Sequence, residues 1–310
     1  VDRTRYVGPA TTLKNFASIN SDENTMLRNG GWSFKEGIFL QLQNPSGTNG
    51  AEQVLFKSFS FYIPLKNLLG FAEDFQKVIL NCKHELILMR SSSDERVFKM
   101  SQAGSHTSKL QITNLTWRVP HITLSDTARL TMIKTIKEAS SLPVAFRSWD
   151  CHFNPTFVGG TKHHWNVKLS THRERPRFVM LSFETKGKFT HCDLTNIKVH
   201  LNSTSYPYDD LNLKFNDDKY GVLYEMYCKF QQNYYLKEPQ PLLSLTEFKD
   251  NPIIIIDVSH QNEMINNGPI DVRIEFETSK EVPASTVAYC LLLHDRLLEY
   301  TPINGVVRKI

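Results

Sequence analysis

The stretch Ile270-Asp-Val-Arg-Ile-Glu-Phe-Glu277 alternates apolar and charged side chains without a break. Ile270, Val272, Ile274 and Phe276 fall on one face of an extended chain, and the charged residues fall on the other. A period of two predicts a β-strand with one buried and one solvated face, which is typical of antiparallel sheets. We therefore expect antiparallel β-structure on both sides of this strand.

Outward from this stretch, the second half of the chain predicts a series of strands and one helix, at Asp218–Gln232. Eight strands within about 160 residues, with no alternation of strands and helices, predict an eight-stranded jelly roll over residues 142–310. The run Ile253–Ile256 is apolar throughout, so we expect that strand to be buried on both faces. The predicted strands are Val144–Asp150, Trp165–Ser170, Arg177–Glu184, Thr195–Asn202, Leu211–Phe215, Ile253–Val258, Ile270–Glu277 and Ala288–Tyr300.

The first half of the chain shows a similar order of predicted strands and helices, with weaker sequence patterns. Residues 1–36 are polar and irregular in sequence, and amphipathic helices are predicted at Leu65–Leu80 and Ser125–Ala139. Only two firm strands precede the first helix, where a jelly roll needs about five. Either residues 1–36 contain further strands or the sandwich begins upstream of Val1. The predicted strands are Gly37–Gln43, Val54–Ile63, His84–Arg90 and Lys109–Val119.

Together these patterns predict an all-β chain with short helices in its connections. It comprises two consecutive eight-stranded antiparallel jelly-roll β-sandwiches, a double jelly roll. The first covers residues 1–141 and includes a linking helix at 125–139, and the second covers residues 142–310. The length of 310 residues also suggests two domains.

Composition excludes several classes of protein. The formal net charge is +4, and no run of five Lys or Arg residues occurs, so we expect no specific nucleic-acid partner. The longest apolar runs, Ile253–Ile256 and Ala288–Leu293, are far shorter than the ~20 residues of a membrane span. The cysteines have no CxxC spacing, and we expect most of them to be small buried apolar residues in reducing surroundings. They are Cys82, Cys151, Cys192, Cys228 and Cys290.

Motifs that carry chemistry are missing from the sequence. It contains no GxxxxGK[ST], GxSxG or HExxH, and its eleven histidines include no HxH pair of the kind that binds metal in cupins. His163 and His164 are adjacent on a predicted strand and should point to opposite faces. Adjacency alone does not make a nucleophile of Cys151 beside His152 or of Cys192 beside His191. We therefore predict no enzyme, with no catalytic, cofactor-binding or metal-binding residues and no small-molecule substrate.

Several segments, in order, resemble one known family. They are Ile63-Pro-Leu-Lys-Asn-Leu-Leu-Gly-Phe-Ala-Glu-Asp-Phe-Gln-Lys-Val78, Lys83-His-Glu-Leu-Ile-Leu-Met-Arg90, Ile112-Thr-Asn-Leu-Thr-Trp-Arg-Val-Pro120, Leu142-Pro-Val-Ala-Phe-Arg147 and Arg175-Pro-Arg-Phe-Val179. Residues 54–300 are similar to the double jelly-roll, hexon-like major capsid proteins of adintoviruses, of Polinton (Maverick) elements and of their endogenous relatives in animal genomes. No single segment is decisive; the ordered set carries the resemblance.

The resemblance implies a structural role without catalytic residues. Its expectations are a homotrimer with a pseudo-hexameric outline, tiling of such capsomers into an icosahedral shell, and location in the virion after assembly inside the host cell. The protein would be a viral capsid protein or a host-captured copy of one. Its partners would be further copies of itself and a minor capsid (penton) protein.

Two other classes of function stay open at this point. A jelly roll also serves as a lectin-like binding module, and a glycan screen would reveal one. A metal-dependent cupin-like enzyme is the least favoured alternative because the HxH pair is missing, and metal analysis would test it. Measuring the particle mass would distinguish shells or trimers from the monomers or small oligomers that both alternatives predict.

Overall fold

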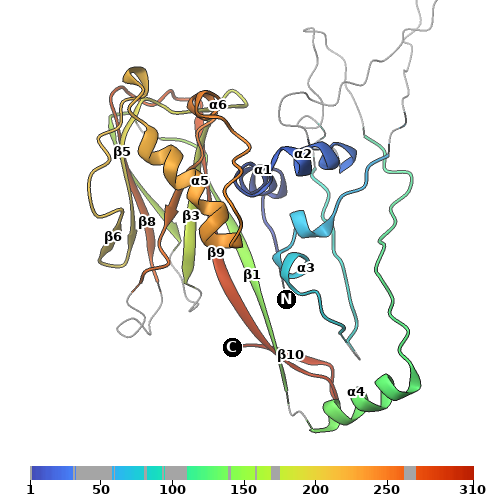
Figure 1. Cartoon of the computed structure of the whole chain (residues 1–310). Coiled ribbons are helices and arrows are strands. Elements are labelled where there is room, and N and C mark those ends of the chain that lie inside the picture. Colours follow the sequence, from blue (N-terminus) through green and yellow to red (C-terminus); the bar gives the residue numbers. More distant parts are fainter. Residues whose placement is uncertain are drawn as a thin grey trace, which may run out of the picture. The chain divides into compact units, whose positions relative to one another are not determined.

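The computed structural model describes residues 2–30, 32, 58, 60–79, 82–92, 94, 110–138, 141–157, 159–168, 175–261 and 270–310 (Figure 1). The chain divides into two compact units. The larger comprises Val1–Gln76 and Ala145–Leu297, and the smaller comprises Lys77–Val144 and Leu298–Ile310. The strand predicted at Gly37–Gln43, and most of the one at Val54–Ile63, lie outside the described residues.

The second half of the chain forms two antiparallel sheets, which we name sheet A and sheet B. Sheet A has six strands in the order β1-β9-β3-β4, with β7 paired to β3 and β10 paired to β9. Its strands are β1 (Leu142–Asn154), β3 (Pro176–Thr185), β4 (Lys188–Thr190), β7 (Ile254–Asp257), β9 (Thr286–Thr301) and β10 (Val306–Lys309). Sheet B has four strands in the order β2-β8-β5-β6. They are β2 (Lys162–Lys168), β5 (Leu194–Leu201), β6 (Thr204–Tyr206) and β8 (Val272–Thr278).

The antiparallel β-sandwich predicted for this half is therefore confirmed, although it has ten strands where eight were expected. The additional pieces are the short strands β4, β6 and β10, which carry too few residues for an alternating pattern to show. The segment Leu211–Phe215 was expected to be a strand and is not one. Lys214 makes only an isolated bridge to Lys219, and the chain turns into a 3₁₀ helix at Phe215–Asp217.

The inner face of sheet B is the one that the alternation predicts. Ile270, Val272, Ile274 and Phe276 are all at most 3% exposed, and Arg273 between them is exposed. In the ladders Ile274 stands opposite Trp165 of β2 on one side and opposite Val199 of β5 on the other. Side chains of β2, β8 and β5 thus pack side by side in the core.

Strands β3, β7 and the first part of β9 in sheet A are buried on both faces. The alternate residues of β3 face different layers: Phe183 contacts Phe276 of sheet B, and Phe178 contacts Phe230 and Tyr234 of helix α5 (Gly221–Tyr235). Strand β7 is buried too, as its unbroken apolar run predicted. One face of the sheet therefore packs on sheet B and the other on a layer of helices.

The helical layer draws on distant parts of the chain. Helix α5 confirms the helix expected at Asp218–Gln232, and α1 (Val7–Ser18) lies beside it (Figure 1). A short helix, α6 (Leu245–Asp250), also packs against α5. The hydroxyl of Tyr227 in α5 donates to the carbonyl of Phe16 in α1 at 2.7 Å, which ties the two long helices together.

The prediction that residues 1–36 are irregular is wrong for the residues described there. Helix α1 buries Ala10, Leu13 and Phe16, which recur every three residues. Helix α2 (Ser21–Leu27) begins with a capping box, in which the Asn20 side chain accepts from the Glu23 amide and the Glu23 side chain accepts from the Asn20 amide. The sequence contains both the three-residue apolar spacing of α1 and the capping box of α2, but each covers only a few residues.

The prediction of one long helix over Leu65–Leu80 is also wrong. The chain forms a 3₁₀ turn at Leu65–Asn67, becomes extended at Leu69, and forms the short helix α3 (Gly70–Asp74). Tertiary contacts override the local helical pattern here, since the Gly70 backbone lies against the Arg147 carbonyl and Asp74 binds the Arg147 side chain.

In the smaller unit, the helix predicted at Ser125–Ala139 is confirmed as α4 (Asp126–Glu138). Neither His84–Arg90 nor the described part of Lys109–Val119 forms a strand. Within the described parts of the whole chain, no helix combines the length and the apolar character that crossing a membrane requires.

We expect Ile274→Ala to lower the free energy of unfolding by roughly 2–5 kcal/mol, because it removes apolar atoms from a fully packed site. Urea denaturation measures this change. The control is Val222→Ala on the exposed side of α5, which should change stability by less than about 0.5 kcal/mol. A loss at Ile274 as small as the control's would show that this face is not the core.

Candidate functional site

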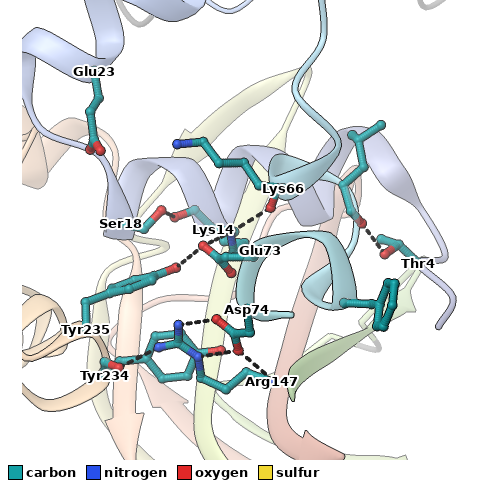
Figure 2. A network of polar contacts seen from close by, with 12 residues as sticks. Thr4, Lys14, Ser18, Glu23, Lys66, Glu73, Asp74, Arg147, Tyr234 and Tyr235 are labelled. Carbon is teal, nitrogen blue, oxygen red and sulfur yellow. Dashed lines mark hydrogen bonds and ion pairs between the residues drawn. The ribbon is translucent and has the colours of Figure 1, made fainter. Parts of the chain in front are cut away.

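A network of charged and aromatic side chains fastens the N-terminal segments onto the second sandwich (Figure 2). We call it the polar clamp and define it by Asp2, Lys14, Glu73, Asp74, Arg147 and Tyr235. Its members come from the N-terminus, α1, α3, β1 and α5, and all lie in the larger unit. Two ion pairs within it, Lys14 with Glu73 and Arg147 with Asp74, are largely shielded from water, and Asp2 is paired with Arg296 at 3.3 Å.

Arg147 of β1 holds the centre of the clamp. Its Nε and Nη2 atoms donate to the two oxygens of Asp74, and its backbone amide donates to Asp74 Oδ2 at 2.7 Å. Its Nη1 donates to the Tyr234 carbonyl at 2.6 Å, and the guanidinium lies 4.4 Å from the centre of the Tyr234 ring. A bidentate pair stacked on an aromatic ring is the arrangement that suits arginine and not lysine.

The pKa values of this pair show that both charges are kept. Burial raises the pKa of Asp74, but hydrogen bonds and attraction from Arg147 outweigh burial and bring it below the usual value. Burial likewise opposes the charge on Arg147, and the bonds to Asp74 outweigh it, so its pKa rises. Because the pKa of Asp74 is lowered on folding, its contribution to stability is complete above the ordinary Asp range and disappears as the pH falls through the lowered value.

Lys14 forms a second buried pair beside the first. It is 1% exposed, and its Nζ lies 2.9 Å from Glu73 Oε1 and 4.5 Å from the centre of the Trp149 ring. The hydroxyl of Tyr235 donates to the same Glu73 oxygen at 3.1 Å. Burial lowers the pKa of Lys14, and Glu73 acts against that change. A lysine at this depth persists because it is paired and lies over an aromatic face.

The chain around α3 also caps the edge of β1. The Arg147 amide donates to Asp74, and a Cβ added at Gly70 would lie 1.8 Å from the Arg147 carbonyl oxygen. At the chain's start, the Asp2 carboxylate accepts from the Phe71 amide at 2.9 Å and from the Ser148 hydroxyl at 2.7 Å. Strand β1 pairs with β9, and the Arg147 amide of β1 is bonded to Asp74 and not to another strand.

The bonds of this arrangement join segments that are far apart in the sequence. A guanidinium with a raised pKa neither gives nor takes a proton, and the carboxylates of the clamp are directed at cations and amide or hydroxyl donors. Among the described residues, no group of three or more His, Cys, Asp or Glu side chains is placed to hold a metal ion. The chemistry that the clamp supplies is cohesion between distant segments.

The histidines singled out in the sequence lie as their spacing predicted. His163 is buried, stacks on Phe276 with ring centres 4.8 Å apart, and has its Nε2 atom 3.0 Å from the Gly160 carbonyl oxygen. His164 points to the other, exposed face, where it meets Glu275. The structure thus separates the two imidazoles.

The cysteines are thiols in the structure, and three of the five are buried. Burial, with Asp150 nearby, raises the pKa of Cys151 to about 12, and burial raises that of Cys192 to about 11. A thiol with so high a pKa carries almost no nucleophilic thiolate at neutral pH. His191, adjacent to Cys192, is engaged elsewhere, since its Nδ1 accepts from the Asp193 amide at 2.9 Å.

The sequence did not reveal the clamp. Lys14 and Glu73 are 59 residues apart, and Asp74 and Arg147 are 73 apart, so no local spacing joins them. Lys14 also lies between Leu13 and Asn15 in α1, and a lone lysine in a helix is ordinarily solvated and not buried.

The fold and the clamp together define a β-sandwich protein whose N-terminal segments are held by ion pairs against its second half. Residues 1–298 match the double jelly roll-like domain family, and the chain belongs to that family. No curated protein matches the chain.

Two solved structures are similar over part of the chain. One is the Sputnik virophage structure determined by cryo-EM at 3.5 Å resolution, with 7% identity and a TM-score of 0.34. The match covers 56% of this chain and 39% of that one. The other is the crystal structure of the mavirus major capsid protein, with 9% identity, a TM-score of 0.29, and coverage of 56% of this chain and 42% of that one. The chain therefore matches about two fifths of the length of each.

We expect Arg147→Met to lower the free energy of unfolding by roughly 2–4 kcal/mol, because Asp74 would lose its partner while it stays largely shielded from water. The matched control is Arg177→Met, whose ion pair with Asp295 lies on the surface and should contribute about 1 kcal/mol at most. Urea denaturation of both variants at pH 7 gives the comparison. Equal losses in the two would contradict the role of the clamp.

Proposed function

We propose that the chain is a structural, non-enzymatic major capsid protein, or a host-captured copy of one. Membership of the double jelly roll-like domain family over residues 1–298 is the observation that carries the proposal. The polar clamp supports it, since the buried charges that it contains serve cohesion and not chemistry. A rigid body with repeated side contacts is what closed symmetric assembly needs.

In the proposed assembly each chain carries two jelly rolls, at residues 1–141 with the linking helix 125–139 and at residues 142–310. The described part of residues 1–141 contains helices and no strand, so the family match carries the first of the two. Three such chains give six similar lobes, a pseudo-hexameric capsomer that tiles an icosahedral shell. Its partners are further copies of itself and a minor capsid (penton) protein at the vertices. Its location is the virion, after assembly inside the host cell.

Exposed apolar side chains in the smaller unit support self-association. Ile87, Met89, Leu115 and Ile122 are between 63% and 85% exposed. Large apolar side chains that stay exposed in a single copy are candidates for contacts between proteins. We propose that they lie in the contacts between copies, which should bury roughly 2,000 Å² or more per interface.

We expect the pure protein to be a trimer by multi-angle light scattering and to form shells or hexagonal arrays by negative-stain microscopy. Met89→Glu with Leu115→Glu should shift the trimer towards monomers, because each places a charge in an apolar contact. The control is Tyr208→Glu, which changes an exposed aromatic residue of the larger unit and should leave the trimer intact.

A monomer at every concentration, with no particles under varied salt and pH, would contradict the capsid proposal. A glycan screen would then test the lectin-like module as the next candidate.

A further inference from the structure

The turn that carries the chain from sheet A to sheet B is built around His191. It spans His191–Asp193, between β4 of sheet A and β5 of sheet B. The His191 carbonyl accepts from the Leu194 amide at 2.9 Å, and the His191 Nδ1 atom accepts from the Asp193 amide at the same distance. Cys192 and Asp193 both have positive φ, of 47° and 50°, a conformation that residues with side chains seldom adopt. Hydrogen bonds within the turn offset the cost of that conformation.

The turn is also fastened to the chain that follows β8. The Ser279 amide donates to the Asp193 carbonyl at 2.9 Å, and Lys280 Nζ lies 3.0 Å from Asp193 Oδ2. The His191 ring stacks flat on the buried ring of Phe215, with ring centres 4.6 Å apart and planes 7° apart. The turn thus joins a corner of the sandwich to the end of β8 and to the aromatic core.

The bond to the Asp193 amide requires a neutral imidazole. An amide N–H is always a donor, so His191 Nδ1 accepts through its lone pair and the ring proton is on Nε2. A second proton would bind Nδ1 and face that N–H. Its remaining acceptor would be the Asp193 carboxylate, whose Oδ1 atom lies 3.5 Å from Nδ1, beyond good hydrogen-bond distance. Protonation therefore removes a bond that holds the turn and favours a geometry that the turn does not have.

The surroundings of His191 keep the ring neutral. The charged groups that face it from its own turn, from α6 and from the chain after β8 are Asp193, Lys249, Asp250 and Lys280. Burial opposes a proton on the ring most strongly, and the two lysines oppose it by repulsion. The two carboxylates favour the proton, as does the face of the Phe215 ring. The opposing effects prevail, and the pKa of His191 lies below the ordinary 6.5.

We propose that the turn His191–Asp193 is an acid-sensitive lock at the corner of the sandwich, closed while the imidazole is neutral and released when it takes up a proton. Because the folded chain resists that proton and the unfolded chain does not, the stabilisation is complete above pH 6.5 and declines as the pH falls below it. Release frees the Asp193 amide and loosens the ties to Ser279 and Lys280. The lock lies within the larger unit and does not rest on the capsid proposal.

The proton affinity of His191 can be measured in the unmodified full chain. The imidazole C2 hydrogen exchanges with deuterium at a rate that follows the neutral fraction of the ring, and mass spectrometry reads the exchange peptide by peptide. The tryptic peptide Phe189–Lys198 contains His191 and no other histidine. We expect the midpoint of its exchange profile to lie below pH 6.5, the ordinary value for histidine. A midpoint at or above that value contradicts the lock.

Two substitutions separate the amide bond from the ring. His191→Asn keeps an acceptor close to the position of Nδ1 but cannot take up a proton, and His191→Phe keeps a ring to stack on Phe215 but has no acceptor. Urea denaturation at one protein concentration gives the unfolding equilibrium constants at pH 7.5 and at pH 5.5. Relative to His191→Asn, the constant of the unmodified chain should rise by a factor of about two to ten between these values.

His191→Phe is the matched control. It lacks the amide bond at both pH values, so its unfolding constant relative to that of His191→Asn should be the same at both. It should also be less stable than the unmodified chain at pH 7.5. Equal responses of the unmodified chain and His191→Asn to pH, or equal stability of His191→Phe and the unmodified chain at pH 7.5, would overturn the lock while leaving the capsid proposal untouched.

Discussion

The ion pair of Asp74 and Arg147 is the constraint on which the rest of the larger unit depends. Strands β3, β7 and the first part of β9 in sheet A are apolar on both faces, and one of those faces needs a cover other than sheet B. The cover includes α1, and α3 is bonded to β1. Both helices come from segments far from the sandwich in sequence. Apolar contact alone sets no register between such segments, whereas a bidentate ion pair fixes position and angle.

The cost of burying those charges explains why the clamp is so fully bonded. A buried ion loses the solvation of water and must recover it from partners of good geometry. Arg147 meets Asp74, a backbone carbonyl and an aromatic face, and Lys14 meets Glu73 and the Trp149 ring. The ion pairs of the clamp are thus largely shielded from water, whereas pairs such as Arg177 with Asp295 and Lys162 with Glu277 lie on the surface.

The periodicity of apolar residues predicted the sandwich. The polar clamp and the short helices near it depend on contacts between residues far apart in the sequence. The alternation of Ile270–Glu277 fixed which face is buried, because one strand carries the whole pattern. Lys14 escaped prediction because its burial depends on Glu73 and Trp149, which come from other parts of the chain. The helix expected over Leu65–Leu80 is not one element, since the backbone is extended at Leu69 and leaves the helix at Phe75. A helical pattern holds no information on the contacts that α3 makes with Arg147.

The central claim is that the N-terminal segments and the second sandwich form one cooperative body, joined by the clamp. Native-state amide hydrogen exchange under increasing denaturant tests it most directly, because it reports the opening free energy of each segment separately. The account predicts that the Leu13 and Phe16 amides of α1 open with the same free energy, and the same dependence on denaturant, as the Met180 amide of β3. Exchange of the α1 amides through a much smaller local opening, while Met180 stays protected, would contradict it.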